Sequence, residues 1–292
     1  MWLFSTIIPV PDLLKAVFIG SKNGFCELLV DWLAERTELV GVIWIDPEKE
    51  RKSFRGALEF ARTRLRRWGL RKTIDEIAFF LYYHAARLPE RESRQLRERV
   101  IIPYRRAHGG PVYGGPSWSG ESIADCDLNS PKTLAWLRER EPDVAFAMCL
   151  NNYFGAELRG LFKHGVFLWH EGITPEYRGL YSPFWAVANG DFERIGYTLL
   201  RMNESYDAGE VFVQGRVTDV DPFHDHHVYL GHKAIADSLP GVERLLGELD
   251  AGTARPIDRS GADSNYYTYP GLSDLIRQRL MLRRLARTNV RV

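Results

Sequence analysis

The sequence predicts an α/β protein with an open, mostly parallel, Rossmann-like sheet. Two short apolar runs, Lys15 to Gly20 and Leu39 to Ile45, are typical of buried parallel strands. The segment between them repeats apolar residues at helical spacing, namely Phe25, Leu28, Leu29, Trp32 and Leu33. A strand, a helix and a strand in this order form a βαβ unit, whose crossover is normally right-handed.

The following segments continue the sheet. Apolar runs predict strands over Asp143 to Cys149 and Gly165 to His170, and a helix is expected over Ser182 to Asn189. Ile195 to Met202 and Glu210 to Val217 are expected to be strands as well. Because short links join these last strands, we expect them to be antiparallel to the others.

The rest of the chain is predicted to be mainly helical. A charged helical pattern covers residues 48 to 98, and glycine and proline predict a loop over His108 to Gly120. A basic helix is expected over Leu272 to Arg287. We therefore expect a catalytic domain over residues 1–217 and a small appendage of helices and loops over residues 218–292.

Composition excludes several classes of protein. Hydrophobic residues make up 45% of the 292 residues and charged residues 26%, which is typical of a globular protein. The net charge of +1 gives no field to hold a polyanion, so nucleic-acid binding is not favoured. The three cysteines, Cys26, Cys126 and Cys149, are odd in number and widely spaced. This pattern favours reduced thiols in a cytoplasm over a set of disulfides. No secretory signal and no membrane span is expected.

Common cofactor and metal motifs are missing or weak. The turn from Gly20 to Gly24 has neither the G-x-G-x-x-G dinucleotide pattern nor the phosphate-loop pattern. The histidines between His224 and His232 lack a firm metal-ligand spacing, so a solvated loop or a helix start is favoured. Cys149 is interpreted as a buried thiol.

Two polar residues are candidates for catalysis. His170 closes a predicted strand, and Asp207 lies in the polar loop from Asn203 to Glu210 between two further strands. Ligands of open α/β sheets bind outside the carboxyl ends of the strands, and we expect both residues at this edge. A histidine and an aspartate there can move protons or stabilise an oxyanion. On spacing alone, ordinary loop polarity is the favoured interpretation.

The segment from His170 to Glu210 resembles the folate-dependent formyltransferases. The matching motif residues, in order, are His170, Pro175, Tyr177-Arg178-Gly179, Asn189-Gly190-Asp191, Gly196, Thr198 and Asp207-Ala208-Gly209-Glu210. The likeness extends over roughly Lys15 to Val217. Several motifs in the correct order and spacing are far more specific than any single one.

The resemblance implies an enzyme with 10-formyltetrahydrofolate as its formyl donor. The family's catalytic histidine and aspartate match His170 and Asp207, and no metal is required. The donor would contact two segments through Asn151, Asn152, Phe154, Asn203 and Tyr206. An amine of the acceptor would attack the formyl carbon.

One position departs from the family pattern. The family has a catalytic asparagine two residues before the histidine, and this chain has Leu168. Alternate residues of a strand share a face, so Leu168 should lie beside His170. Loss of one oxyanion donor typically costs a rate factor of about 10²–10³. Asn151 or Asn152 could replace it, or these residues line the donor pocket or form a turn.

We therefore expect an N-formyltransferase that acts on a small-molecule amine, such as an amino-sugar nucleotide or a specialised metabolite. Formylation of methionyl-tRNA is the alternative enzyme activity, although that subfamily carries a β-barrel where this chain is predicted to be helical. A non-catalytic folate-binding or scaffold protein is the other alternative, because of Leu168. A homodimer is left open.

Overall fold

The structure is a computed structural model that describes residues 13–45, 54–107, 116–148, 152–204 and 209–287. The side chains of residues 54–61 and of residue 92 lie outside this description. Among the described helices, none combines the length and the apolar character needed to cross a membrane.

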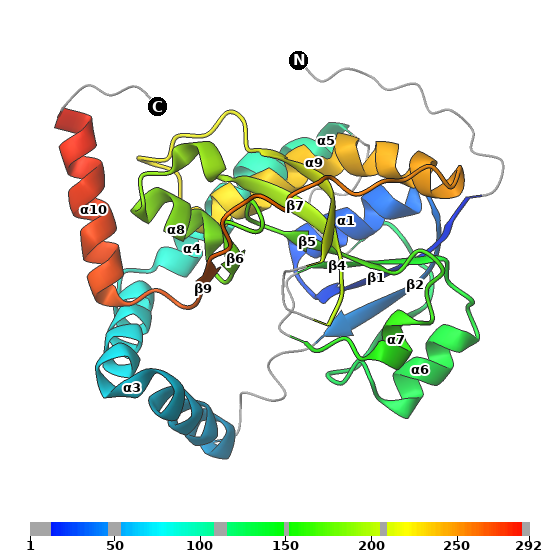
Figure 1. Ribbon diagram of the computed structural model, residues 1–292, viewed down its shortest axis with the longest axis horizontal. Helices are drawn as coiled ribbons and strands as arrows, with labels where there is room; N and C mark the ends of the chain where they lie inside the picture. The colour runs from blue at the N-terminus through cyan, green and yellow to red at the C-terminus, as the bar shows by residue number, and fades with distance from the viewer. Residues whose placement is uncertain (1–12, 46–53, 108–115, 149–151, 205–208, 288–292) are drawn as a thin grey trace.

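A seven-stranded sheet forms the centre of the molecule, with the strand order β3-β2-β1-β4-β5-β7-β8 (Figure 1). The strands are β1 (Lys15–Ser21), β2 (Glu38–Ile45), β3 (Ser122–Ala124), β4 (Val144–Met148), β5 (Val166–His170), β7 (Gly196–Arg201) and β8 (Glu210–Arg216). Strands β1 to β5 pair in parallel, whereas β7 and β8 are antiparallel to their neighbours. The predicted fold class is confirmed, and each predicted strand lies within one residue of its expected ends.

Helices flank the sheet and extend beyond one end of it. They are α1 (Gly24–Ala34), α3 (Phe54–Ala85), α4 (Leu88–Leu96), a π-helical turn (Arg97–Ile101), α5 (Ile102–Ala107), α6 (Pro131–Arg138), α7 (Ala156–Arg159), α8 (Ser182–Ala188), a 3-10 turn (Phe192–Arg194), α9 (His227–Asp250) and α10 (Leu272–Arg287). Side-chain caps start some of them: Asn23 Oδ1 accepts two N–H groups of α1, and Ser130 Oγ accepts one of α6. Gly69, at φ 79°, breaks α3 into two helical parts.

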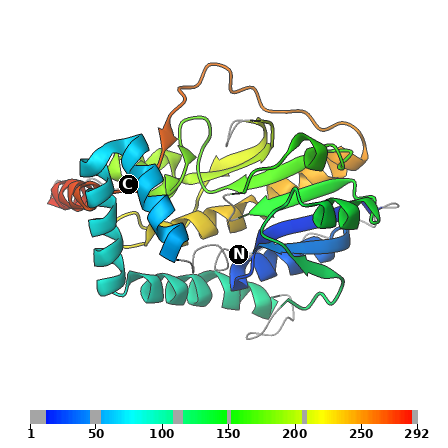
Figure 2. The ribbon, with the colours of Figure 1, turned by 90° about the horizontal axis from the view of Figure 1, so that it is seen from below.

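Side-chain alternation along the strands gives the sheet two apolar faces. On β1, Phe18 belongs to the core that includes residues of α1 and α9, whereas Val17 and Ile19 belong to a second core. Leu134 of α6 and Leu158 of α7 cover that second face. Figure 2 shows α3 and α10 together at one end of the molecule, beyond the sheet.

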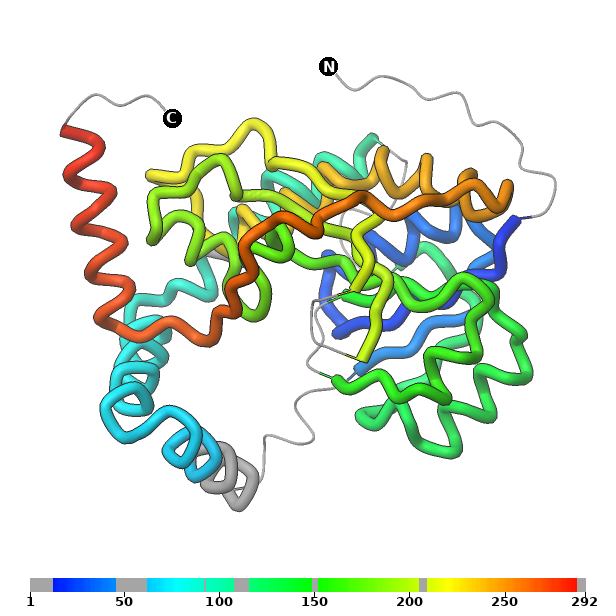
Figure 3. The backbone as a smooth tube through the Cα atoms, viewed as in Figure 1, coloured from blue at the N-terminus to red at the C-terminus, as the bar shows by residue number. Residues whose placement is uncertain are grey.

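A long connection, which we call the strap (residues 251–271), joins α9 to α10 and is coloured orange in Figure 3. Ile257 N–H donates to Val211 O of the edge strand β8 at 2.7 Å. Further on, β9 (Tyr266–Tyr267) pairs in parallel with β6 (Arg178–Gly179). The strap thus ties the C-terminal part of the chain to the loop after β5. The boundary after residue 217 remains a prediction.

Candidate active site

His170 lies at the carboxyl end of β5 and is buried. Its Nε2 atom is 2.7 Å from the carbonyl oxygen of Tyr177 and 3.2 Å from Ser182 Oγ. Ser182 Oγ itself donates to the same carbonyl at 3.1 Å. Because a carbonyl only accepts, Nε2 is assigned a proton, and Nδ1 is the ring nitrogen that this contact does not use. The contacts therefore fix the orientation of His170.

A row of polar side chains next to His170 holds the loop that follows it. Thr198 of β7 pairs with His170, and Gln214 of β8 pairs with Thr198. Thr198 Oγ1 donates to Gly172 O at 2.7 Å and accepts from Thr174 N–H at 3.1 Å. Gln214 Nε2 donates to Thr198 Oγ1 at 2.9 Å and to Thr174 O at 2.8 Å. These bonds place the first turn of the loop against the sheet.

Gly172 allows the loop to close on the start of α8. A Cβ atom at this position would lie 2.6 Å from Ser182 Cβ and 2.7 Å from Tyr177 O. Any larger residue would push apart the two groups that contact His170 Nε2. Glycine is needed here for close approach rather than for an unusual backbone conformation.

The motif residues Tyr177, Asn189 and Asp191 form a second hydrogen-bonded cluster. Tyr177 Oη donates to Asp191 Oδ2 at 3.0 Å, and Asn189 Nδ2 lies 3.4 Å from the same hydroxyl. The Tyr177 ring stacks on Tyr267 of the strap, with centroids 5.2 Å apart. Burial raises the pKa of Tyr177 above its usual value, and Asp191 adds to the effect. This tyrosine therefore stays neutral and acts as a scaffold.

The strap adds an ion pair that sequence analysis missed. Arg259 Nη2 lies 2.6 Å from both carboxylate oxygens of Glu176, and its Nε is 3.3 Å from Thr174 O. Asn265 N–H donates to Pro175 O at 3.1 Å. The loop after His170 is thus held from the sheet and from the strap.

Leu168 is half-buried and packs with the second core, which also contains Val166 two residues earlier. Its neighbours across the sheet are Ala147 on β4 and Leu200 on β7. All three positions are apolar, so no side-chain amide stands at or directly opposite residue 168 on these strands. Leu168 thus lies among apolar side chains, two residues before His170 on the same strand.

Part of the first predicted donor-binding segment already contacts other parts of the protein. Asn152 Nδ2 donates to Cys126 O at 2.8 Å, which ties this segment to the loop before α6. The Phe154 side chain is buried in the second core with Leu158. Asn151 lies outside the described residues. Contacts from Phe154 to a donor would therefore come from its backbone.

The second predicted donor segment lies elsewhere than expected. Arg201 pairs with Phe167, so the loop after β7 leaves the sheet at the amino end of β5. The expectation that this loop starts at the carboxyl edge is therefore corrected: the antiparallel direction of β7 reverses it. Asn203 is exposed there. Tyr206 and Asp207 lie outside the described residues.

An ion pair joins α7 to the chain that follows β7. Arg159 Nη2 of α7 lies 3.7 Å from Glu204 Oε1. Arg159 is mostly buried, whereas the Glu204 side chain is 85% exposed, so the pair contributes little energy. It nevertheless shows that the chain after β4 and the chain after β7 lie close together.

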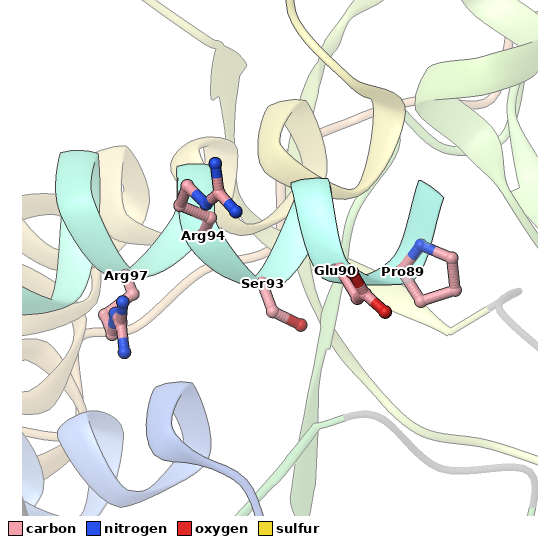
Figure 4. A pocket seen from close by; sticks show the side chains of 5 residues that line it. All are labelled: Pro89, Glu90, Ser93, Arg94 and Arg97. Atoms are coloured by element: carbon pink, nitrogen blue, oxygen red, sulfur yellow. The ribbon is translucent and has the colours of Figure 1, made fainter. Parts of the chain in front are cut away.

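Two surface hollows are lined by none of the predicted site residues. One, of about 460 Å³, is lined by Pro89, Glu90, Ser93 and Arg94 of α4 and by Arg97 of the π-helical turn (Figure 4). The other, of about 160 Å³, lies between helices and includes His226 and His227. We assign neither hollow to the predicted reaction.

Residues that sequence analysis missed are Ser182, Gln214 and Arg259. Gln214 left a signal, because it is a polar residue in an apolar strand. Ser182 and Arg259 left none, since their partners are set by the turn into α8 and by the course of the strap.

No family model matches the chain. The methionyl-tRNA formyltransferase of Synechocystis sp. is 26% identical over 175 residues, which cover 60% of this chain and 51% of that protein. The chain is therefore similar in sequence to a formyltransferase. The predicted resemblance is confirmed, although the chain spans about half the length of this curated relative.

Solved structures share the formyltransferase fold. HypX from Aquifex aeolicus in complex with tetrahydrofolic acid has a TM-score of 0.51 and 13% identity, covering 93% of this chain and 34% of that chain. A sugar N-formyltransferase from Shewanella sp. FDAARGOS_354 has a TM-score of 0.49 and 15% identity, covering 87% of this chain and 76% of that chain. At such identity, the HypX match establishes the fold alone.

Proposed function

We propose that this chain is a folate-dependent N-formyltransferase that uses 10-formyltetrahydrofolate and a small-molecule amine. The observation that carries this proposal is His170, whose Nε2–H donates to Tyr177 O at the end of β5. A histidine fixed in this way is ready to act on a reacting carbonyl without reorganisation. We place the protein in the cytoplasm, where reduced folates and the amine acceptor would both be available.

The proposed reaction is a direct transfer. The amine nitrogen attacks the formyl carbon and forms the new C–N bond, which places a negative charge on the formyl oxygen. The bond from that carbon to N10 of the folate then breaks as the C=O bond forms again. The amine proton finally reaches N10, giving a formamide and tetrahydrofolate. Asp207 keeps the imidazole of His170 oriented and charged, so that Nδ1–H can donate to the oxygen that becomes negative, and Asp207 also helps to remove the amine proton.

A catalytic pair of His170 and Asp207 requires that the loop after β7 reach the carboxyl end of β5. The described end of the loop, at Glu204, leaves the sheet at the amino end of β5. For Asp207 to reach His170, the chain after Glu204 needs to return along the face that carries Leu168. The ion pair of Glu204 with Arg159 of α7 places the start of this loop beside the chain that follows β4, which supports the proposal.

The acceptor is proposed to be an amino-sugar nucleotide or a specialised metabolite. The net charge of +1 does not favour a tRNA. The described part of residues 218–292 holds two helices and the short strand β9. Methionyl-tRNA remains the alternative acceptor, because the curated relative acts on it by name.

Leu168 favours a second candidate function, a folate-binding protein without catalytic activity. An apolar residue where the family has an amide removes one donor to the oxyanion. The scaffold around His170 would still allow a folate to bind. Both proposed functions include folate binding, and only the enzyme also transfers the formyl group.

One experiment separates them. Tetrahydrofolate release is measured with 10-formyltetrahydrofolate and a panel of amino-sugar nucleotides, with methionyl-tRNA as a further arm. Calorimetry with 5-formyltetrahydrofolate measures donor binding in parallel. Binding with turnover supports the enzyme, and binding without turnover on any acceptor supports the non-catalytic protein. A chain that binds ATP or a nicotinamide and no folate contradicts both.

A further inference from the structure

Helix α3 carries an apolar stripe on its outer surface. Leu70, Ile74, Ile77 and Leu81 have exposed fractions of 63%, 56%, 51% and 62%. They follow the break at Gly69, so the stripe occupies one continuous helical part. Soluble helices normally turn polar residues outward, and an apolar stripe of this kind marks a contact surface.

The opposite side of this helix already packs against the protein. Phe79 is buried and stacks on Tyr83, with ring centroids 5.5 Å apart. Asp75 accepts two hydrogen bonds from Ser273 of α10, at 2.5 and 2.9 Å. At 100° per residue, the stripe points away from all of these contacts. The stripe is therefore a second apolar face of a helix whose first face is in use.

The spacing of the stripe is that of a coiled-coil seam. Steps of four, three and four residues separate Leu70, Ile74, Ile77 and Leu81. These are successive d and a positions of a heptad, which are filled when another helix lies alongside. The spacing identifies a helix as the occupant.

The stripe is also a palindrome. Read in either direction, it is leucine, isoleucine, isoleucine, leucine with the same gaps. A two-fold axis between Ile74 and Ile77 would place Leu70 of one copy against Leu81 of the other, and Ile74 against Ile77. Symmetric dimers require such self-complementarity, and an unrelated partner does not.

The residues beside the stripe agree with an antiparallel arrangement. The same two-fold places exposed Arg71 of one copy opposite Phe80 of the other, whose side chain is 59% exposed. A guanidinium over an aromatic ring is favourable. A parallel pair would instead bring together the basic ends around Arg67 and Arg71.

We propose that two copies of this chain associate through an antiparallel pair of α3 helices, with Leu70, Ile74, Ile77 and Leu81 as the seam. This inference does not depend on the proposed catalytic function. The seam is short, so the dimer dissociates on dilution.

Sedimentation velocity of the full chain tests the proposal. The wild type should pass from 33.6 kDa to twice that mass as its concentration rises. Ile77→Glu should weaken association by about 100-fold or more, because two like charges would be buried at the seam. Ile276→Glu is the matched control: Ile276 is equally exposed, at 51%, but lies on α10. Circular dichroism melts verify that both variants are folded.

Cysteine cross-linking tests the direction. Leu70→Cys and Leu81→Cys variants should each give little disulfide dimer alone, and a mixture should give the heterodimer. A wild type that remains a monomer up to about 100 µM overturns the proposal, and so does a dimer that Ile77→Glu leaves intact. Cross-links within each single variant, rather than in the mixture, overturn the antiparallel seam. Flotation of a monomer with anionic phosphatidylserine vesicles would identify a membrane as the occupant instead.

Discussion

Two histidines contact the start of α8: His170 is buried, whereas His227 is half-buried. His170 has its Nε2 atom 2.7 Å from a carbonyl oxygen and 3.2 Å from Ser182 Oγ. The ring of His227 lies 5.2 Å from the ring of Tyr181, the residue that precedes Ser182. His227 Nε2 is buried, and the described residues provide no hydrogen-bond partner for it. One histidine is oriented by polar groups, and the other is enclosed by aromatic rings.

This difference shows that burial alone does not make a histidine suitable for proton transfer. Burial holds the pKa of His227 well below its usual value, and the nearby His226 adds to the effect. The pair of rings is 4.1 Å apart, so a charge on His227 would be unfavourable. His170 instead has polar partners for Nε2 and a polar loop packed around it. We expect function at His170 and packing at His227.

The largest effect should come from His170 itself. We expect His170→Phe to lower the rate of tetrahydrofolate release by about 10²–10⁴, the usual contribution of a general acid or base. The same substitution at His227 should leave the rate within a few-fold of wild type, because Tyr181 and Phe184 already form an aromatic environment. Equal losses in two folded variants would remove the distinction between these histidines.

Leu168 tests whether the surroundings of His170 are complete. We expect Leu168→Asn to raise the initial rate of formyl transfer, by up to about 10²–10³, because it restores one oxyanion donor. Leu168→Met keeps the volume without the amide and should leave the rate unchanged. If neither variant differs from an active wild type, residue 168 is irrelevant to catalysis.

If Asn152 supplies the oxyanion donor that Leu168 lacks, the expected result for Leu168→Asn changes. Its amide nitrogen already donates to Cys126 O, so we expect Asn152→Ala to loosen this loop and to leave the chemical step unaffected. A rate loss of about 10²–10³ at saturating substrates would show that Asn152 acts as the replacement donor.

A smaller effect is expected at Ser182, a positioning residue. Its hydroxyl donates to the carbonyl that also accepts from His170. Ser182→Ala should lower kcat by about 5-fold, the equivalent of one net hydrogen bond, with KM unchanged. Tyr181→Phe, on the His227 side of the same turn, is the control. A change in KM alone would place Ser182 in binding rather than in positioning.

Sequence reasoning predicted the strands well because apolar runs and their polar ends are local features. Val166–His170 ends at the expected histidine, and α10 covers the expected residues. The short strand Ser122–Ala124 was missed, since it has no buried apolar run. Its place in the sheet depends on pairing with β2.

The site was harder to predict from the sequence, because its geometry depends on contacts between residues that lie far apart in the chain. Arg259 and Glu176 meet only through the course of the strap. The position of Asn203 follows from the direction of β7, which reverses the edge that a parallel strand would use. A helix start was one of the two alternatives for the His224–His232 segment, and α9 does begin there, but the aromatic contacts of His227 depend on α8 and α3.

The depressed pKa of His227 should make the free energy of unfolding depend on pH. Its usual value is 6.5, and burial holds the value in the folded protein well below this. Between these two values, the unfolded chain binds a proton that the folded chain does not. The free energy of unfolding should therefore fall as the pH drops below about 6.5, by up to about 1.4 kcal/mol per pH unit. Urea denaturation between pH 8 and about pH 5.5 measures it, and His227→Phe should flatten the curve by about 1 kcal/mol at the acid end. The exposed His224 provides the control: Asp221 raises its pKa, so its contribution has the opposite sign, and His224→Asn should not flatten the curve. Parallel curves for wild type and His227→Phe would mean that His227 finds a partner for its proton, and the contrast with His170 would then no longer hold.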